Sequence, residues 1–135
     1  MAAGVGMDLI EVARVERALD RHPRLADRLF TAAEQRYAAS KGRPGRHLAA
    51  RFAAKEAVVK ALRLPPGTEL REIEVVAGNE TDPAPTISLS GRVREEAESR
   101  GLAVQVSLTH AREMAGAVAI ADPVHADPAP ADPEA

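Results

Sequence analysis

Cysteine and tryptophan are absent from this chain of 135 residues, and aromatic residues make up only 2% of it. Without cysteine there is no disulfide scaffold, no thiolate zinc site and no cysteine nucleophile. The aromatic residues are Phe30, Tyr37 and Phe52, so the core must be built from Leu, Val, Ile and Ala. These side chains each bury little area, so we expect a single subunit of modest stability that would gain from association.

The chain also lacks a long apolar run and a strong charge of either sign. No segment approaches the roughly 20 apolar residues of a membrane-spanning helix, and residues 1–12 lack the basic start of a secretory signal. We therefore expect a cytoplasmic protein with no membrane partner. The formal net charge of −2 argues against binding nucleic acid through overall charge, although it leaves a local basic surface open.

Composition changes near the carboxyl end of the chain. Residues 121–135 read ADPVHADPAPADPEA, and their repeated prolines and scarcity of large apolar residues prevent a regular helix or sheet. We predict one folded domain over residues 1–120, followed by a disordered acidic tail over residues 121–135.

Periodicity within residues 1–120 predicts helices mostly first and antiparallel strands mostly later, which is typical of an α+β fold. Thr31 and Glu34 form a capping-box pattern that predicts a helix start at Ala32. The segment KGRPGR at residues 41–46 predicts a loop. The predicted helices cover residues 11–22, 32–40, 47–63 and 90–101. The predicted strands cover residues 5–9, 72–77, 86–90, 104–109 and 116–120.

Two carboxylates have positions that allow more than one interpretation. Asp8 lies between Met7 and Leu9 in the first predicted strand, where it either faces a cavity or points outward by simple alternation. Glu56 lies at the edge of the apolar arc of helix 47–63, four residues before Lys60. It is either half of an ordinary surface pair or part of a site where the helix meets the rest of the protein.

The apolar arc of helix 47–63 itself contains a charge. At 100° per residue, the four large apolar residues fall within an arc of about 80°, and Lys55 lies inside it. An ammonium group there must snorkel to solvent or enter a polar pocket. The four apolar residues are Leu48, Phe52, Val59 and Leu62.

Further basic residues stand at the end of a strand and along the first helices. His110 follows Thr109 at a predicted strand end, a position that suits either a ligand contact or an ordinary turn. Five arginines recur every three or four residues, so a continuous helix would align them for an acidic partner, or leave them as a solvated face. Pro23 interrupts that continuity. The arginines are Arg14, Arg17, Arg21, Arg24 and Arg28.

Carboxylates together with cations indicate a magnesium–phosphate site, because Mg²⁺ takes one or two protein carboxylates and completes its coordination with phosphate and water. The chain has no P-loop and no GxGxxG motif, so nucleotide folds of those types are not indicated.

Three segments follow one another in a recognisable order: GVGMDLIEVARV at residues 4–15, RFAAKEAVVKAL at 51–62 and VSLTHAREMAGAVAI at 106–120. Together they resemble the holo-[acyl-carrier-protein] synthase family, the small 4'-phosphopantetheinyl transferases. The resemblance implies an antiparallel sheet packed on a long helix, and a homotrimer with coenzyme A bound between neighbouring subunits. It also implies transfer of 4'-phosphopantetheine from coenzyme A to a serine of an apo acyl carrier protein, releasing adenosine 3',5'-bisphosphate.

The resemblance assigns roles to individual residues. Asp8 and Glu56 match the Mg²⁺ ligands, and with Lys60 they form the expected catalytic group. The expected coenzyme A contacts are Arg51, Lys55, Lys60 and His110. The expected carrier-docking residues are Arg14, Arg21, Arg24 and Arg28.

The chain departs from the family pattern in two places. The helix 47–63 is followed by RLPPGTEL, where the family has a glycine-rich turn, and His110 is followed by Ala111 rather than a small hydroxyl or acidic residue. The altered turn favours one alternative, a module that binds coenzyme A or a carrier protein without catalysis. A second alternative is a structural oligomer that uses helix 47–63 only as an interface.

Overall fold

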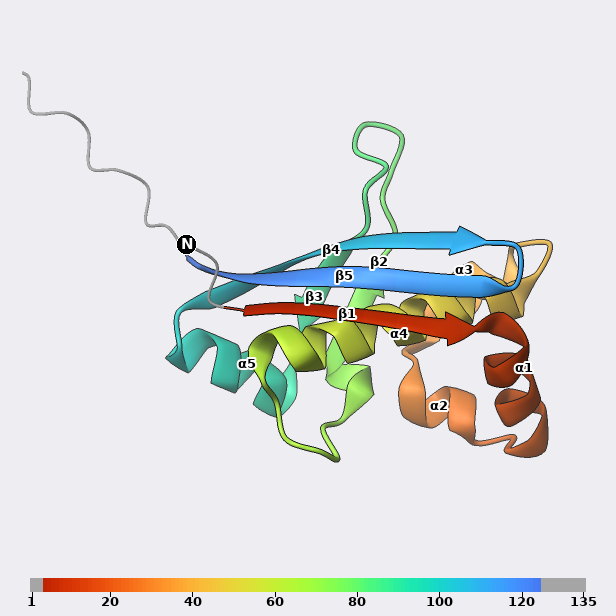
Figure 1. Cartoon of the computed structure of the whole chain (residues 1–135), viewed down its shortest axis with the longest axis horizontal. Helices are drawn as coiled ribbons and strands as arrows, with labels where there is room; N and C mark the ends of the chain where they lie inside the picture. Colours follow the sequence, from red (N-terminus) through yellow and green to blue (C-terminus); the bar gives the residue numbers. More distant parts are fainter. Residues whose placement is uncertain (1–3, 125–135) are drawn as a thin grey trace, which may run out of the picture.

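The computed structural model describes residues 4–124, in which one long helix packs against an antiparallel sheet (Figure 1). The helical elements are α1 (Val12–Arg21), α2 (Leu25–Leu29), α3 (Ala32–Ala39), α4 (Pro44–Leu62), the 3₁₀ turn η1 (Leu70–Glu72) and α5 (Gly91–Ser99). The strands are β1 (Gly4–Glu11), β2 (Ile73–Val76), β3 (Thr86–Leu89), β4 (Leu102–Ala111) and β5 (Met114–Pro123). The α+β fold class expected from the sequence is confirmed.

The main sheet joins the two ends of the chain. Its strand order is β1-β5-β4, and both pairs are antiparallel. Within this register Asp8 lies opposite Ala117, and His110 lies opposite Ala115. A second, two-stranded sheet is formed by β2 and β3, whose connecting loop projects from the rest of the molecule in Figure 1.

Helix α4 approaches β1 closely because both elements carry small residues where they meet. A Cβ atom at Gly4 would overlap the carbonyl oxygen of Ala61, and one at Gly6 would overlap the carbonyl oxygen of Ala57. On the neighbouring strand β5, the side chains that face α4 are also alanines. The lack of bulk therefore lets helix and strand lie nearly backbone to backbone, and the next inward residue of β1 after Gly6 is Asp8.

The buried surface of α4 differs from the predicted arc. Of the four large apolar residues of that arc, Leu62 is buried, whereas Leu48, Phe52 and Val59 are only partly buried. The fully buried positions are mostly alanines, because α4 is covered by the main sheet on one side and by α1, α3 and β2 on others. These alanines are Ala49, Ala50, Ala53, Ala54, Ala57 and Ala61.

Several element boundaries differ from the sequence-based expectation. Helix α4 begins at Pro44 rather than at residue 47, because proline is well suited to the first position of a helix. Strand β4 continues to Ala111, so His110 lies within the strand and not in the turn. Strand β5 ends at Pro123 with Ala121 fully buried, three residues beyond the predicted domain boundary. Most of the predicted tail, residues 125–135, lies outside the described residues.

The capping box predicted at Thr31 and Glu34 is present. The Thr31 hydroxyl accepts a hydrogen bond from the Glu34 amide at 3.2 Å, and Glu34 Oε1 accepts one from the Thr31 amide at 2.8 Å. None of the helices within residues 4–124 is both long and apolar enough to cross a membrane.

The sheet face turned away from α4 exposes large apolar side chains. On β1, Val5, Met7 and Leu9 are 67%, 63% and 60% exposed, and on β5 Val118 and Ile120 are each 38% exposed. The register places Val5 opposite Ile120 and Met7 opposite Val118, so these residues form one continuous apolar patch. A patch of this kind on a folded protein marks an interaction surface.

The close approach of α4 to β1 predicts a strong effect of one added methyl group. Gly6→Ala should lower the free energy of unfolding by about 1–3 kcal/mol, because the methyl group meets backbone that cannot move aside without repacking. Gly42→Ala is the matched control, since a Cβ there meets no atom within 4 Å. Urea denaturation at a fixed protein concentration measures both variants. Equal stability of the two would contradict the proposed contact.

Candidate functional site

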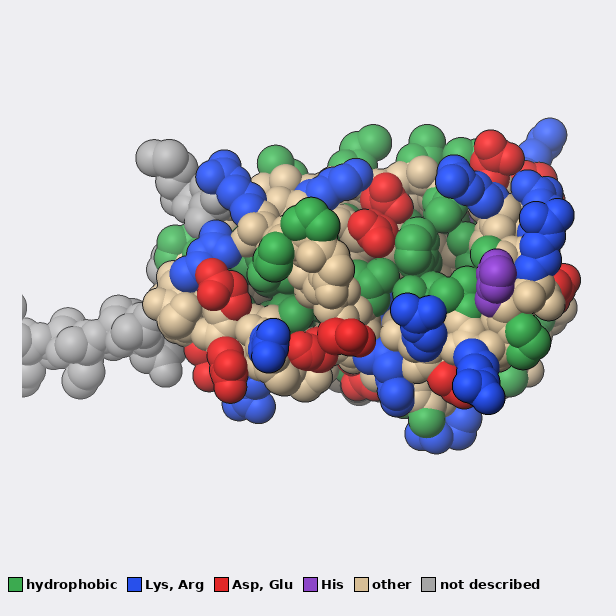
Figure 2. All heavy atoms as spheres, turned by 90° about the horizontal axis from the view of Figure 1, so that it is seen from below, with side chains coloured by type: hydrophobic (Ala, Val, Ile, Leu, Met, Phe, Trp, Pro, Cys, Tyr) green, Lys and Arg blue, Asp and Glu red, His purple; other side chains and the backbone are tan. Residues whose placement is uncertain are grey.

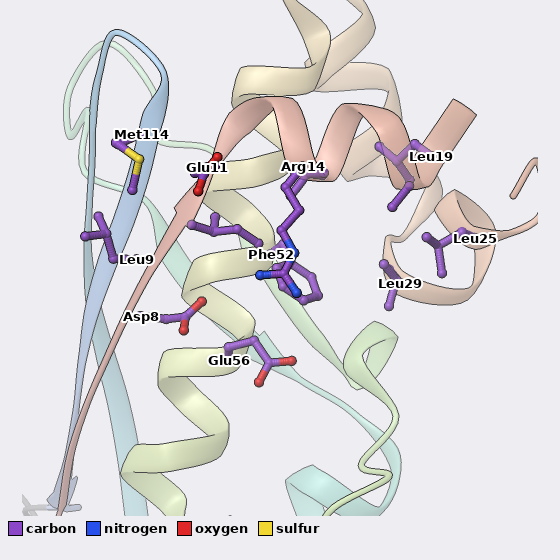
Figure 3. A pocket seen from close by; sticks show the side chains of 13 residues that line it. Asp8, Leu9, Glu11, Arg14, Leu19, Leu25, Leu29, Phe52, Glu56 and Met114 are labelled. Atoms are coloured by element: carbon purple, nitrogen blue, oxygen red, sulfur yellow. The ribbon is translucent and has the colours of Figure 1, made fainter. Parts of the chain in front are cut away.

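A pocket of about 550 Å³ opens between β1, α1, α2 and α4. Most of its wall is apolar, including Phe52, Leu25 and Leu29. Two of the polar side chains that line it are Asp8 from β1 and Glu56 from α4. Figure 3 shows the Asp8 side chain pointing from β1 toward α4 and the Glu56 side chain projecting from α4. The two acidic residues singled out from the sequence therefore meet at one site.

The charges of Asp8 and Glu56 interact. Partial burial raises the pKa of Glu56, the negative charge of Asp8 raises it further, and Lys60 lowers it. The Lys60 ammonium donates to the carbonyl oxygen of Met7 at 2.8 Å and contacts Asp8 Oδ1 at 3.4 Å. Lys60 is thus held beside the two carboxylates but remains half exposed.

The donor set of this site suits Mg²⁺. Two carboxylates whose charges repel each other gain from a shared cation, and Mg²⁺ typically uses one or two protein carboxylates together with phosphate oxygens and water. Within residues 4–124, no group of three or more His, Cys, Asp or Glu side chains comes together as a metal site. A transition-metal cage with several protein ligands is therefore not formed by the described residues.

On a different side of α4, Lys55 is fully buried and belongs to a polar network. Its ammonium donates to Glu34 Oε1 at 2.8 Å, to the carbonyl oxygen of Leu70 at 2.9 Å and to that of Ile73 at 2.6 Å. Burial lowers the pKa of Lys55, and the carboxylate of Glu34 opposes this effect. Glu34 Oε2 also accepts a hydrogen bond from the amide of Val75 at 2.9 Å. The network ties α4 to α3, η1 and β2.

A basic–aromatic cluster surrounds the first turns of α4. The Arg51 guanidinium lies over the ring of Tyr37 at 4.0 Å, and the Lys41 ammonium lies 4.7 Å from the same ring. The His47 ring contacts Tyr37 and His110 edge to face, with centroid distances of 5.8 and 6.1 Å. Arg51 and His110, both expected to contact coenzyme A, are therefore parts of one cluster, whereas Tyr37, Lys41 and His47 were missed.

The charges in the basic–aromatic cluster favour an anion. Burial lowers the pKa of His47, and the positive charges of Arg51 and His110 lower it further. Burial also lowers the pKa of Arg51. The Nε atoms of Arg46 and Arg51 are buried and have no hydrogen-bond acceptor among the described residues. Buried donors are normally paired, so these two groups are exceptions among the described residues.

The predicted arginine face is divided by a helix break. Helix α1 ends at Arg21, and α2 begins after Arg24, so Pro23 separates the series as expected. Arg14 lines the pocket of Asp8 and Glu56, while Arg21, Arg24 and Arg28 line a neighbouring hollow. All four are exposed. Figure 2 shows basic side chains gathered on the half of the molecule where α1 and α2 lie.

Comparison with known proteins gives the same assignment as the resemblance. Residues 4–119 match the 4'-phosphopantetheinyl transferase superfamily. A holo-[acyl-carrier-protein] synthase of Moorella thermoacetica is 44% identical over 119 residues, covering 87% of this chain and 91% of that protein. The chain belongs to the 4'-phosphopantetheinyl transferase superfamily. The family and the enzyme class predicted from the sequence are thereby confirmed.

Solved structures of the superfamily share the fold. The acyl carrier protein synthase of Mycobacterium tuberculosis is 35% identical, with a TM-score of 0.73 over 92% of this chain and 100% of that chain. A holo-(acyl-carrier-protein) synthase of Bacillus anthracis, described in complex with CoA (3',5'-ADP), is 30% identical. Its TM-score is 0.73, and the match covers 92% of this chain and 99% of that chain.

One residue expected to act in this transferase is placed elsewhere. Lys55 was predicted to contact coenzyme A, but its side chain is 0% exposed and all three of its N–H donors are used within the protein. Of the two alternatives that its position inside the apolar arc left open, snorkelling to solvent and a polar pocket, the structure shows the polar pocket. That pocket is an internal one, so the structure makes Lys55 a residue that holds α4 in place.

The buried Lys55–Glu34 pair predicts a loss of stability when one partner is removed. Lys55→Met should cost about 3–5 kcal/mol, because it leaves the Glu34 carboxylate buried without a cation. The double variant Glu34→Gln, Lys55→Met removes both charges and is expected to recover part of the loss. Urea denaturation curves of both variants test this, and a double variant less stable than Lys55→Met alone would contradict it.

Proposed function

We propose that this enzyme transfers 4'-phosphopantetheine from coenzyme A to a serine hydroxyl of an apo acyl carrier protein and releases adenosine 3',5'-bisphosphate. The observation that carries the proposal is the convergence of Asp8 and Glu56 in one pocket beside Lys60. The Moorella thermoacetica and Bacillus anthracis proteins support it, because the first is named for the product carrier and the second is described with coenzyme A.

Asp8 and Glu56 are the residues that would hold Mg²⁺. When bound, Mg²⁺ supplies positive charge to the pyrophosphate oxygens on which negative charge develops during phosphoryl transfer. The rigid backbone of β1 and the buried side of α4 fix the two carboxylates before substrate binds. Lys60, which donates to the Met7 carbonyl oxygen and contacts Asp8, would neutralise the leaving phosphate.

Arg51 and His110 would bind a phosphate of coenzyme A through the basic–aromatic cluster. The unpaired Nε of Arg51 supports this role. Neither residue lines the pocket of Asp8 and Glu56, so the two positions would hold separate parts of one long ligand or act from neighbouring subunits. Arg14, Arg21, Arg24 and Arg28 would dock the acidic surface of the carrier protein.

Mass spectrometry of the carrier protein tests the proposed reaction. With coenzyme A and Mg²⁺, the apo carrier should gain the mass of one phosphopantetheine group. Asp8→Asn and Glu56→Gln should each lower turnover by about 10²–10³-fold or more, as expected when charge stabilisation in the transition state is lost. Glu95→Gln, an exposed residue of α5, is the matched control and should retain activity.

Two outcomes of this experiment would overturn the proposal. Binding of coenzyme A or carrier without a gain in carrier mass would indicate a binding module and not a transferase. Full activity in both the Asp8 and the Glu56 variants would remove these residues from the site.

We also propose that the enzyme is a homotrimer in the cytoplasm. The apolar patch formed by β1 and β5 supports association, because Val5, Met7 and Leu9 are each at least 60% exposed on a core that is small and rich in alanine. Burying this patch against other copies would supply stability that the core of one subunit lacks.

The proposed assembly predicts the behaviour of a surface substitution. Met7→Lys should change a trimer into smaller species, because it places a charge within an apolar interface. The substitution is expected to cost a single subunit little, since Met7 is 63% exposed. Ala39→Lys, at an exposed position at the end of α3, should leave the assembly intact. Light scattering coupled to size-exclusion chromatography measures the mass of each, and a monomeric parent protein would refute the assembly.

A further inference from the structure

A groove of about 750 Å³ lies between α2 and the segment that connects α4 to β2. One wall is α2, from Arg24 to Leu29, and the other is the segment from Gly67 to Arg71. The second wall includes residues 67–70 of RLPPGTEL, the turn that follows α4.

The wall formed by residues 67–71 is held firmly. The Thr68 hydroxyl donates to the carbonyl oxygen of Pro65 at 2.6 Å, which closes the turn around Gly67. The buried ammonium of Lys55 then holds the carbonyl oxygens of Leu70 and Ile73. Arg71 lies between these two anchored residues, so its backbone is fixed while its side chain is exposed.

The groove has a surplus of positive charge that is not used inside the protein. Three arginines line it, Arg24, Arg28 and Arg71, against the two carboxylates of Asp27 and Glu69. Asp27 already accepts a hydrogen bond from Gln35 at 3.1 Å. Among the salt bridges formed within residues 4–124, none involves any of these three arginines. The three guanidinium groups are thus available to an acidic partner.

The groove continues into the pocket that holds the catalytic carboxylates. Leu25 and Leu29 of α2 line both, and they form the boundary between them. A carrier protein is much larger than the pocket. One that presents a serine to Asp8 and Glu56 must therefore also cover Leu25 and Leu29. Its surface next to the serine then faces the groove, where apolar side chains can rest on the leucines and acidic ones can reach the arginines.

We propose that Arg71 extends the carrier-docking surface of α1 and α2 across the groove between α2 and residues 67–71, where it binds a further acidic segment of the carrier protein. This inference rests on the proposed function, since the occupant is the protein substrate of that reaction. Arg71 selects among carriers according to the charge they place opposite it. Part of the turn RLPPGTEL lines this groove, and none of it lines the pocket of the two carboxylates.

Charge reversal at Arg71 tests the inference in the full-length protein. Arg71→Glu should raise the KM for an apo acyl carrier protein about 10-fold, through repulsion of an acidic partner, with unchanged kcat and unchanged KM for coenzyme A. Arg71→Gln should raise it about 2–5-fold, the usual value of one exposed ion pair. Added salt should reduce the difference between the variants and the parent protein.

Arg92→Glu is the matched control. Arg92 is an exposed arginine of α5 outside this groove, and its side chain forms no salt bridge among the described residues. It should leave all three kinetic constants near those of the parent. Melting temperatures of both variants confirm that each is folded. A carrier KM for Arg71→Glu within two-fold of the parent value, or an equal effect of Arg92→Glu, would overturn the inference.

A direct binding measurement separates this inference from the proposed function. Fluorescence anisotropy of a labelled apo carrier, without coenzyme A, reports affinity independently of catalysis. If the parent protein binds the carrier but does not modify it, the proposed function fails while the loss of affinity in Arg71→Glu still supports the groove. Absence of carrier binding by the parent protein would overturn the role of the groove as well.

Discussion

The structure depends on the contact between α4 and β1, where glycine meets alanine and no side chain separates the two backbones. Gly4 and Gly6 leave room for the carbonyl groups of Ala61 and Ala57. Because Asp8 is the next inward position of the same strand, this contact carries its carboxylate to the part of α4 that bears Glu56 and Lys60. The position of Asp8 beside Glu56 and Lys60 thus depends on the absence of side chains at Gly4 and Gly6.

The same contact brings two carboxylates together. Burial raises the pKa of Glu56 and the negative charge of Asp8 raises it further, so the two groups repel each other when both are ionised. A divalent cation held by both, as proposed, would relieve that repulsion. On another side of the helix the buried pair of Lys55 and Glu34 fixes α4 against α3 and β2. Adjacent residues of one helix therefore have different surroundings: Lys55 holds the fold together, and Glu56 lines the pocket.

The fold class and the two carboxylates could be predicted from the sequence because local patterns and motifs shared with the family mark them. The capping box at Thr31 and Glu34 and the alternation around Asp8 are of this kind. Lys55 was assigned to coenzyme A although its side chain is buried, because a charge within an apolar arc either snorkels or enters a polar pocket, and the arc does not tell whether such a pocket is internal. His47 and Tyr37 were missed because their role depends on contacts between α3, α4 and β4 that no short spacing records. The start of α4 was set too late because a proline was interpreted as part of a loop, when it occupies the first turn of the helix.

The pairing of β1 with β5 has a consequence for how the polypeptide matures. Gly4 lies opposite Ala121, so β1 gains its neighbour in the sheet only after the more than one hundred residues that separate the two strands have been synthesised. During that interval Val5, Met7 and Leu9 belong to a nascent segment without its sheet neighbour, which is prone to pair with the wrong edge. Synthesis of β5, and not the speed of any local step, therefore sets the earliest moment at which Asp8 is held in its final position.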